Sequence, residues 1–315
     1  MNILLTGASG YIAGHCLLKL ASSGHSIFGL DFFEPKDTSL FQEFYVGDSG
    51  NSGFIQPILK GERIECIIHA AGSSNVIATV KDPFKYYCND LIGTIFFLQS
   101  ALAENVKKFI FLSSAQVYGN ISQGAATETT PCFPINPLGK IKLAIEQLIE
   151  SLTISHDLHA IVLRISNVCG MDLRAAIFPK NEDLIPNLLC NENVNIFGNN
   201  CSTPDRSPER DFIHVNDVAQ AILLTLPKLN YSQKYFVYNI ASGRTYSVRD
   251  VVKIAEKITN KSPAINFHGR RNGEIERLVV ASQHAQMELD WHMQHPSLEY
   301  MIESARSWLR TRSVG

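Results

Sequence analysis

The chain has 315 residues, enough for one large α/β unit or two unequal lobes with a sizeable core. Its 28 basic and 30 acidic residues give a formal net charge of −2, so neither a nucleic-acid-binding stripe nor a charged disordered tail is indicated. No apolar run is long enough to span a membrane, and the predicted first strand has no basic leader before it. We therefore expect a cytoplasmic protein without a signal peptide or membrane anchor.

The cysteines and histidines indicate no disulfide framework and no metal site. The seven cysteines are scattered, their number is odd, and no CxxC pair occurs, which is typical of reduced thiols. The ten histidines show no metal-ligand spacing.

Apolar runs separated by turn signals predict alternating strands and helices. Strands are expected at residues 2–5, 26–30, 44–46, 66–69, 109–112, 160–165, 194–197, 212–215 and 237–240. Helices are expected directly after the first strand and at residues 54–60, 84–104, 138–151, 184–189, 217–225, 248–258, 285–289 and 298–309. This alternation predicts an α/β fold of the Rossmann type, a doubly wound parallel sheet covered on both faces. The looser pattern after residue 170 predicts a smaller C-terminal lobe that closes over the cleft.

The glycine-rich turn after the first strand is the strongest local signal. Gly7 allows a tight turn, and Gly10 lets a pyrophosphate approach the backbone. Ala13 or Gly14 lets the following helix pack closely against the strand. The free N–H groups and the positive dipole end at that helix N-terminus then suit phosphate. Strand, glycine turn and helix together predict a dinucleotide site.

Asp31 stands at the end of the second predicted strand. A carboxylate at this place accepts hydrogen bonds from the adenosine ribose and repels a 2′-phosphate, so it favours NAD over NADP. The alternative is that Asp31 caps a helix and the glycine turn is an ordinary strand-to-helix turn. The succession of strand, glycine turn, helix, strand and acid favours the dinucleotide site over this alternative.

Small or polar residues follow five predicted strands. They are Asp31, Asp48, Gly72, Ser114 and Asn167. Because ligands of doubly wound sheets bind beyond the carboxyl ends of the strands, we expect these residues to converge on one cleft.

With these motifs the sequence resembles the extended short-chain dehydrogenase/reductases, of the NAD-dependent sugar-nucleotide epimerase/dehydratase kind, and most closely the UDP-glucose 4-epimerase-like proteins. The resemblance runs nearly end to end. It is carried by the glycine turn, Asp31, residues 47–48, 69–72, Asn89, 113–119, the tract IFGNNCSTPDRSPERDFIHV at 196–215, and residues 238–243 and 270–274.

The resemblance implies a set of cofactor contacts. The residues expected to bind NAD are Gly7, Gly10, Tyr11, Ile12, Asp31, Asp48, Ala70, Ala71, Gly72, Asn89 and Lys142. Asp48 would reach the adenine, Asn89 would lie beside the cofactor cleft, and Lys142 would bind the nicotinamide ribose. NAD binding would occupy residues 1–170, with 211–240 returning to that domain.

The resemblance also implies a nucleotide sugar as substrate, held mainly by residues 171–315. Its expected contacts are Ser114, Asn167, Leu184, Phe197, Arg210 and Arg271. Ser114 would hydrogen-bond the reacting hydroxyl. The two arginines suit a diphosphate because a guanidinium binds it with two parallel hydrogen bonds. The alternative for either arginine alone is a solvated surface charge.

The sequence departs from the family at residue 138. The family carries a tyrosine four residues before its lysine, and here Leu138 precedes Lys142. In the family mechanism the tyrosinate takes the proton of the sugar hydroxyl while hydride leaves the carbon for NAD, and an epimerase returns the hydride to the other face of the keto sugar. Leucine cannot move a proton, and a positioned acid/base contributes about 10²–10⁴-fold in rate.

Three interpretations follow. The protein is an active enzyme at sugar C4, epimerase or dehydratase, with another acid/base; or it binds NAD and a nucleotide sugar without catalysis, as a sensor or subunit; or Leu138 is an alteration of an ordinary epimerase. The candidate catalytic groups besides Ser114 are Lys142, Tyr118, Lys140 and Cys132. Burial would lower the pKa of Lys142, whereas family members carry a tyrosine at Tyr118 beside the working one. We favour the active enzyme because the remaining motifs match together.

The relatives also imply a homodimer built from the two long helices, residues 84–104 and 138–151. Outward apolar residues would be Phe96, Phe97, Ile145 and Leu148. The alternative is that these side chains pack on the sheet.

Overall fold

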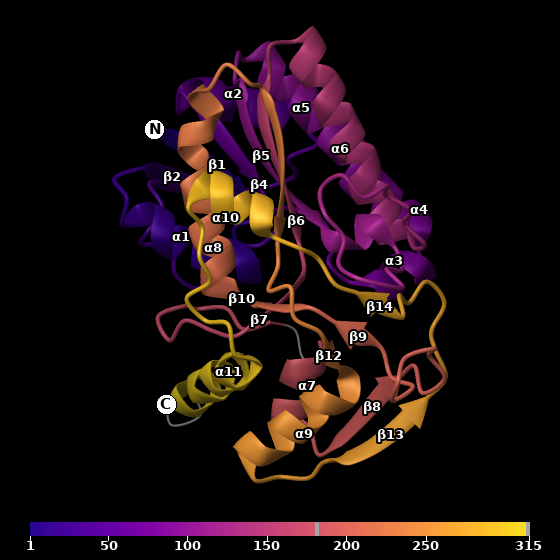
Figure 1. The fold of residues 1–315 in the computed structure, drawn as a ribbon. Helices are drawn as coiled ribbons and strands as arrows, with labels where there is room; N and C mark the ends of the chain where they lie inside the picture. The colour runs from indigo at the N-terminus through magenta and orange to yellow at the C-terminus, as the bar shows by residue number, and fades with distance from the viewer. Residues whose placement is uncertain (180–182, 313–315) are drawn as a thin grey trace.

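The computed structural model describes residues 1–179 and 183–312, and a seven-stranded parallel sheet forms its centre (Figure 1). The strands are β1 (Asn2–Thr6), β2 (Ser26–Asp31), β3 (Glu43–Val46), β4 (Cys66–His69), β5 (Lys108–Ser114), β6 (His159–Ile165) and β11 (Tyr235–Ile240). Their order is β11-β6-β5-β4-β1-β2-β3. The chain thus proceeds outward from β1 in both directions, which confirms the doubly wound Rossmann-type sheet. Its topological switch, where ligands bind in such sheets, lies between β1 and β4.

Helices cover both faces of this sheet (Figure 1). One face is packed by α1 (Tyr11–Ala21), α8 (Val215–Thr225) and α10 (Gln283–Leu289), and the other by α2 (Ser52–Gly61), α5 (Gly93–Ala103) and α6 (Pro137–Ser155). Alternate residues of β1 point to opposite faces, so Ile3 and Leu5 enter the first core and Leu4 the second. Burial on both faces explains why these strands are continuous apolar runs.

The helix expected at residues 84–104 is not continuous. The structure has α4 (Pro83–Tyr86), then a π-helical turn η1 (Tyr87–Ile92), then α5. The prediction of one regular helix was therefore wrong, because a single wide turn barely changes an apolar periodicity summed over twenty residues. A short helix before it, α3 (Val76–Lys81), and two 3₁₀ turns, η2 (Ala115–Tyr118) and η3 (Leu226–Asn230), were not expected either.

The smaller lobe lies beyond the lower end of the sheet in the view of Figure 1. It contains α7 (Leu184–Cys190), α9 (Val248–Thr259), α11 (Leu298–Arg312) and a parallel pair, β8 (Asn193–Phe197) with β13 (Ala264–His268). Its own core includes Leu188, Val194, Val251 and Ile302. Ser247 and Asp250 form a reciprocal capping box at the start of α9.

Short strands connect the lobe to the sheet. They are β7 (Asn167–Cys169) paired with β10 (Phe212–His214), and β9 (Glu209–Arg210) between β12 (Tyr246–Ser247) and β14 (Arg277–Leu278). Within residues 211–240, α8 and β11 return to the main sheet, whereas β10 pairs outside it. The chain returns once more through α10 and Trp291, a fully buried residue whose Nε1–H donates to the Asp217 carbonyl at 2.9 Å.

All seven cysteines are free thiols. In the part of the chain that the structure describes, no helix combines the length and apolar character needed to cross a membrane.

Candidate active site

A cavity of about 590 Å³ opens at the carboxyl ends of β1, β4, β5 and β6 and extends under the smaller lobe. Its size is typical of a small-molecule or cofactor site. The expected site residues that line it are Gly7, Gly10, Tyr11, Ile12, Ala70, Gly72, Ser114, Leu138, Lys142, Asn167, Leu184, Phe197, Arg210 and Arg271. The expected cofactor residues and the expected substrate residues therefore line one continuous cavity.

The glycine turn forms one end of the cavity. Gly7 has a φ of +65°, and a Cβ on it would lie 2.7 Å from the Ala71 nitrogen, so only glycine fits between β1 and β4. Gly10 donates its N–H to the Gly7 carbonyl at 2.8 Å and is the N-cap of α1. No side chain caps α1 there, so its first N–H groups face the cavity as an anion site.

Four expected cofactor residues lie outside the cavity lining: Asp31, Asp48, Ala71 and Asn89. Asp31 is the last residue of β2, and its carboxylate accepts the backbone N–H of Ser9 at 3.0 Å and of Phe32 at 2.7 Å. Asp48 is exposed just after β3 and accepts the N–H of Gly50. Ala71 forms the backbone against which Gly7 packs.

Leu138 and Lys142 lie one turn apart at the start of α6. Asn136 begins this helix by accepting the Gly139 N–H at 2.9 Å, and Pro137 occupies its first turn. Both Leu138 and Lys142 are buried apart from the surface that they present to the cavity. Ser114 reaches the cavity from the end of β5, where its Oγ accepts the Gln116 N–H at 3.2 Å.

The Lys142 amine lies in an apolar setting. Its Nζ donates to the Leu112 carbonyl at 2.9 Å and stands 4.7 Å from the centre of the Phe111 ring. Burial lowers the pKa of Lys142 to about 8, while the nearby carboxylates of Asp90 and Glu146 act in the opposite direction. A lysine in this range is partly neutral under mildly alkaline conditions, so its amine can accept a proton.

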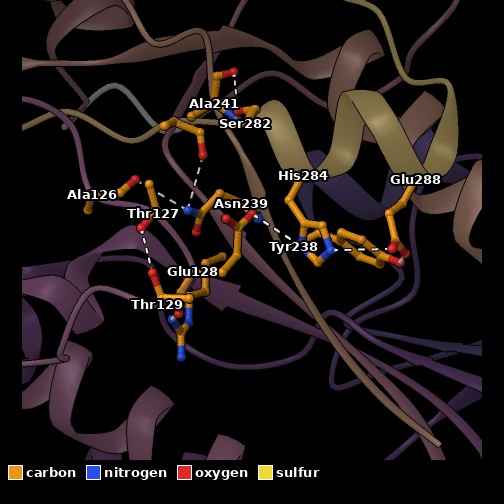
Figure 2. Close-up of polar contacts among 12 residues, drawn as sticks. Ala126, Thr127, Glu128, Thr129, Tyr238, Asn239, Ala241, Ser282, His284 and Glu288 are labelled. Carbon is orange, nitrogen blue, oxygen red and sulfur yellow. Dashed lines mark hydrogen bonds and ion pairs between the residues drawn. The ribbon is translucent and has the colours of Figure 1, made fainter. Parts of the chain in front are cut away.

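Tyr118 does not line the cavity, contrary to the expectation that it could be catalytic. Its hydroxyl donates to the Asn239 Oδ1 at 2.7 Å and accepts from Arg164 at 2.9 Å. The Asn239 amide group in turn donates to the Ala126 carbonyl (Figure 2). It also donates to the Ala281 carbonyl, so its oxygen must be the acceptor for Tyr118. Burial raises the pKa of Tyr118 to about 12. This phenol is a fixed structural donor.

Two other acid/base candidates are also displaced from the site. Lys140 is exposed on α6, two residues before Lys142 and so on a different side of the helix. Cys132 is half-buried against a separate apolar cluster, and burial raises the pKa of its thiol. Neither side chain lines the cavity.

Asn89 is exposed on the π-helical turn, and the structure does not bring it to the cavity. Its neighbour Asp90 points inward instead and accepts the Ser73 N–H at 2.8 Å. A Cβ placed on Gly72 would lie 3.6 Å both from the Asp90 carboxylate and from the Lys142 Nζ. Asp90 was not predicted from the sequence, because a regular helix gives no reason to turn this residue inward.

The far end of the cavity carries two arginines and an acid. The Arg271 guanidinium lies 4.4 Å above the centre of the Phe197 ring and forms an ion pair with Glu274 at 3.0 Å. Arg210, on β9, approaches the same Glu274 at 3.9 Å. Glu274 thereby holds both arginines at the cavity wall. Its role was not predicted either, although it closes the basic tract at residues 270–274.

Residues 3–241 match the model of the NAD dependent epimerase/dehydratase family. The chain belongs to this family. The UDP-glucose 4-epimerase of Halalkalibacterium halodurans is 34% identical over 325 residues, which cover 100% of this chain and 97% of that protein.

Solved structures give the same result. The UDP-glucose-4-epimerase from Stenotrophomonas maltophila, with bound NAD and formylated UDP-arabinopyranose, has a TM-score of 0.91 at 28% identity and covers 100% of this chain and 99% of its own. The UDP-glucose 4-epimerase from Bifidobacterium longum in complex with NAD+ and UDP has a TM-score of 0.91 at 28% identity and covers 99% of each chain. The resemblance predicted from the motifs is confirmed, and so is NAD as the cofactor of this epimerase/dehydratase family member. The tight glycine turn and uncapped α1 N-terminus fit its pyrophosphate.

Proposed function

We propose that this epimerase/dehydratase family member is a UDP-hexose or UDP-N-acetylhexosamine 4-epimerase that oxidises and re-reduces the sugar at C4. The observation that supports this most is the single cavity that joins the glycine turn, Ser114 with Lys142, and the arginine pair. Relatives that match the whole chain are named UDP-glucose 4-epimerase, and one related structure holds NAD+ and UDP.

The cofactor half of the site is the sheet portion, residues 1–170 with 211–240. NAD supplies a hydride acceptor when bound. The α1 N-terminus would hold its pyrophosphate, and Asp31, with its carboxylate oriented by two backbone N–H groups, would accept from the adenosine ribose. Asp48 lies one strand further on and is available to the adenine end. Ala70, Ala71 and Gly72, which follow β4, would contact NAD from that side of the site.

The substrate half is formed by the smaller lobe, mainly residues 171–315. Arg210 and Arg271 would bind the diphosphate, and their shared contact with Glu274 fixes their spacing before a ligand arrives. Asn167, Leu184 and Phe197 line the remaining wall and would hold the nucleoside. The sugar then points back toward Ser114, Leu138 and Lys142.

The acid/base is Lys142 in this proposal. Leu138 occupies the place from which a phenol would reach the sugar, and Tyr118 is committed to Asn239 and Arg164. Of the four acid/base candidates named from the sequence, Lys142 is the one that lines the cavity. Ser114 would donate to the sugar oxygen and orient it. The second candidate function, binding without catalysis, is favoured only by Leu138 itself.

A turnover assay by NMR separates the two functions. UDP-glucose, UDP-galactose and their N-acetyl counterparts are each incubated with the protein and NAD while the anomeric proton is followed. We expect the anomeric signal of the C4 epimer to appear with at least one of them. An unchanged spectrum with all four sugars, with NAD binding measured in the same sample, would contradict the epimerase and support the binding-only function.

We also propose a homodimer, in the cytoplasm where free thiols are stable. An exposed apolar stripe runs along η1 and α5 through Ile92, Ile95 and Phe96. Two of the expected outward residues do not belong to it: Phe97 and Ile145 are fully buried in the core against the sheet. Leu148 is half-buried against the same core.

The substitution Phe96→Asp tests this surface. We expect wild-type protein to scatter light as a dimer at micromolar concentration and the variant to be a monomer, because a desolvated carboxylate in an apolar interface is unfavourable. Met287→Asp is the matched control, since Met287 is an exposed apolar residue on α10 at the opposite face of the sheet. A wild-type monomer would refute the dimer.

A further inference from the structure

Gly72 lines the cavity just beyond the carboxyl end of β4. Two ionisable groups border it: a Cβ on Gly72 would lie 3.6 Å from the Asp90 Oδ2 and 3.6 Å from the Lys142 Nζ. The φ of Gly72 is +120°, a backbone conformation that side-chain-bearing residues rarely adopt, so no side chain of residue 72 stands beside the two groups. Two elements, η1 and α6, thus bring an acid and an amine to the same side of Gly72, and the amine lines the cavity.

Asp90 is held in this position by the backbone. The π-helical turn places it inward, and its Oδ2 accepts the Ser73 N–H at 2.8 Å. Burial raises the pKa of Asp90, although this hydrogen bond and the charge of Lys142 act against the rise. Burial lowers the pKa of Lys142. The two groups therefore approach each other in proton affinity, and each responds to the charge of the other.

We propose that Asp90 is a positioning residue that sets the protonation state of Lys142 and stabilises the ammonium formed when Lys142 takes the proton of the sugar hydroxyl. This inference rests on the proposed function. In the oxidation step the O–H bond at C4 breaks and its proton goes to the neutral Lys142 amine. The C4–H bond breaks with its electron pair, which leaves as hydride to NAD, and the C4–O bond becomes a carbonyl. The return step gives the same proton back to the oxygen and the hydride to the other face, so nothing is consumed.

The other charged neighbours of Lys142 leave Asp90 as its main partner. Glu146 follows one turn later on α6, but it forms a buried ion pair with Arg164 at 2.7 Å. His69, from β4, is buried between the hydroxyls of Thr6 and Thr94, and burial lowers its pKa to about 3, so it stays neutral. Asp90 accordingly exerts a larger attraction on the Lys142 charge than Glu146 does.

The substitution Asp90→Asn separates this role from a merely structural one. The asparagine oxygen can still accept the Ser73 N–H, but the negative charge is lost. In nitrogen-15 lysine-labelled full-length protein, with and without NAD, the Lys142 Nζ signal is assigned by its disappearance in Lys142→Met and titrated with pH. We expect the Lys142 midpoint to fall by about one pH unit or more in Asp90→Asn, since the loss of a nearby opposite charge in a partly buried site has that order of effect.

Controls make the result specific. Asp90→Glu, which restores the charge on a longer stem, should return the midpoint toward the wild-type value. Glu150→Gln removes an exposed carboxylate two turns from Lys142 on the same helix and should leave the midpoint unchanged. The acid limb of the kcat profile should move with the midpoint, while the KM for the nucleotide sugar stays constant.

An unchanged Lys142 midpoint in folded Asp90→Asn, shown by its melting curve, would overturn the proposal whether or not the enzyme turns over. A shifted midpoint in a protein that converts no nucleotide sugar would uphold the pairing of Asp90 with Lys142 and refute the proposed function. The titration therefore tests the pairing of Asp90 with Lys142, and the turnover assay tests the proposed function separately.

Discussion

Leu138→Tyr is expected to raise turnover of the preferred nucleotide sugar by about 10²-fold, the lower end of what a positioned acid/base contributes, because Lys142 already moves the proton in the wild-type protein. Position 138 lies in the first turn of α6 and lines the cavity, four residues before Lys142 and so on the same side of the helix. A tyrosine there can extend its ring into the cavity instead of into the core. Its hydroxyl would lie near the Lys142 amine, whose charge favours the phenolate.

Leu138→Phe is the matched control, since it adds the same ring without a hydroxyl. The two variants and the wild-type protein are compared by the rate at which the epimer's anomeric signal grows. An equal rate in the tyrosine and phenylalanine variants would contradict the assignment of position 138 to the proton-transfer site. A large gain confined to tyrosine would show that the rest of the catalytic site is intact and that residue 138 limits the rate.

Lys142→Met is expected to abolish detectable turnover while leaving NAD binding measurable. Methionine keeps the unbranched stem that passes Phe111, and Asp90, whose pKa is raised by burial, can take up a proton when the ammonium is absent, so the fold should be retained. Turnover by NMR, NAD binding by calorimetry and a melting curve distinguish lost chemistry from lost structure. The matched control is Lys140→Met, an exposed lysine on the same helix, which should keep wild-type turnover.

If Lys142 is the acid/base, turnover of the wild-type enzyme must depend on pH. The amine of Lys142 accepts a proton only when it is neutral, and its pKa is lowered to about 8. Turnover should therefore rise as the pH increases through about 8 and should level off above it. A rate that is flat across this range in the wild-type protein, or residual turnover in Lys142→Met, would contradict Lys142 as the acid/base.

The sheet and both ends of the site could be predicted because their signals are local. Continuous apolar runs such as residues 66–69 mark strands buried on both faces, and the structure has β4 at Cys66–His69. Gly7 is required by a turn whose backbone contacts leave no room for a Cβ, so the residue type itself reports the geometry. Arg210 and Arg271 were predicted from the tracts at residues 196–215 and 270–274. Their shared contact with Glu274 was not predicted.

The predictions that were wrong depend on contacts between distant parts of the chain. Phe97 and Ile145 were expected to face outward, but periodicity alone does not say which side of a helix meets the sheet, and both are buried there. The sequence makes Tyr118 a candidate base, but its hydroxyl is hydrogen-bonded to Asn239, 121 residues away in the chain. No local pattern encodes such a partner.

The sequence by itself determined the doubly wound fold, the family, the cofactor and the missing phenol at Leu138, because each depends on residue types at short spacing along the chain. Only the tertiary structure decided which ionisable groups meet at the cavity. Asp90 turns inward on a π-helical turn and comes near Lys142 of α6 beside Gly72, from segments spread over residues 72–142. Proximity across the fold and the burial that comes with it set the proton affinity of these groups, and neither quantity is local in the sequence.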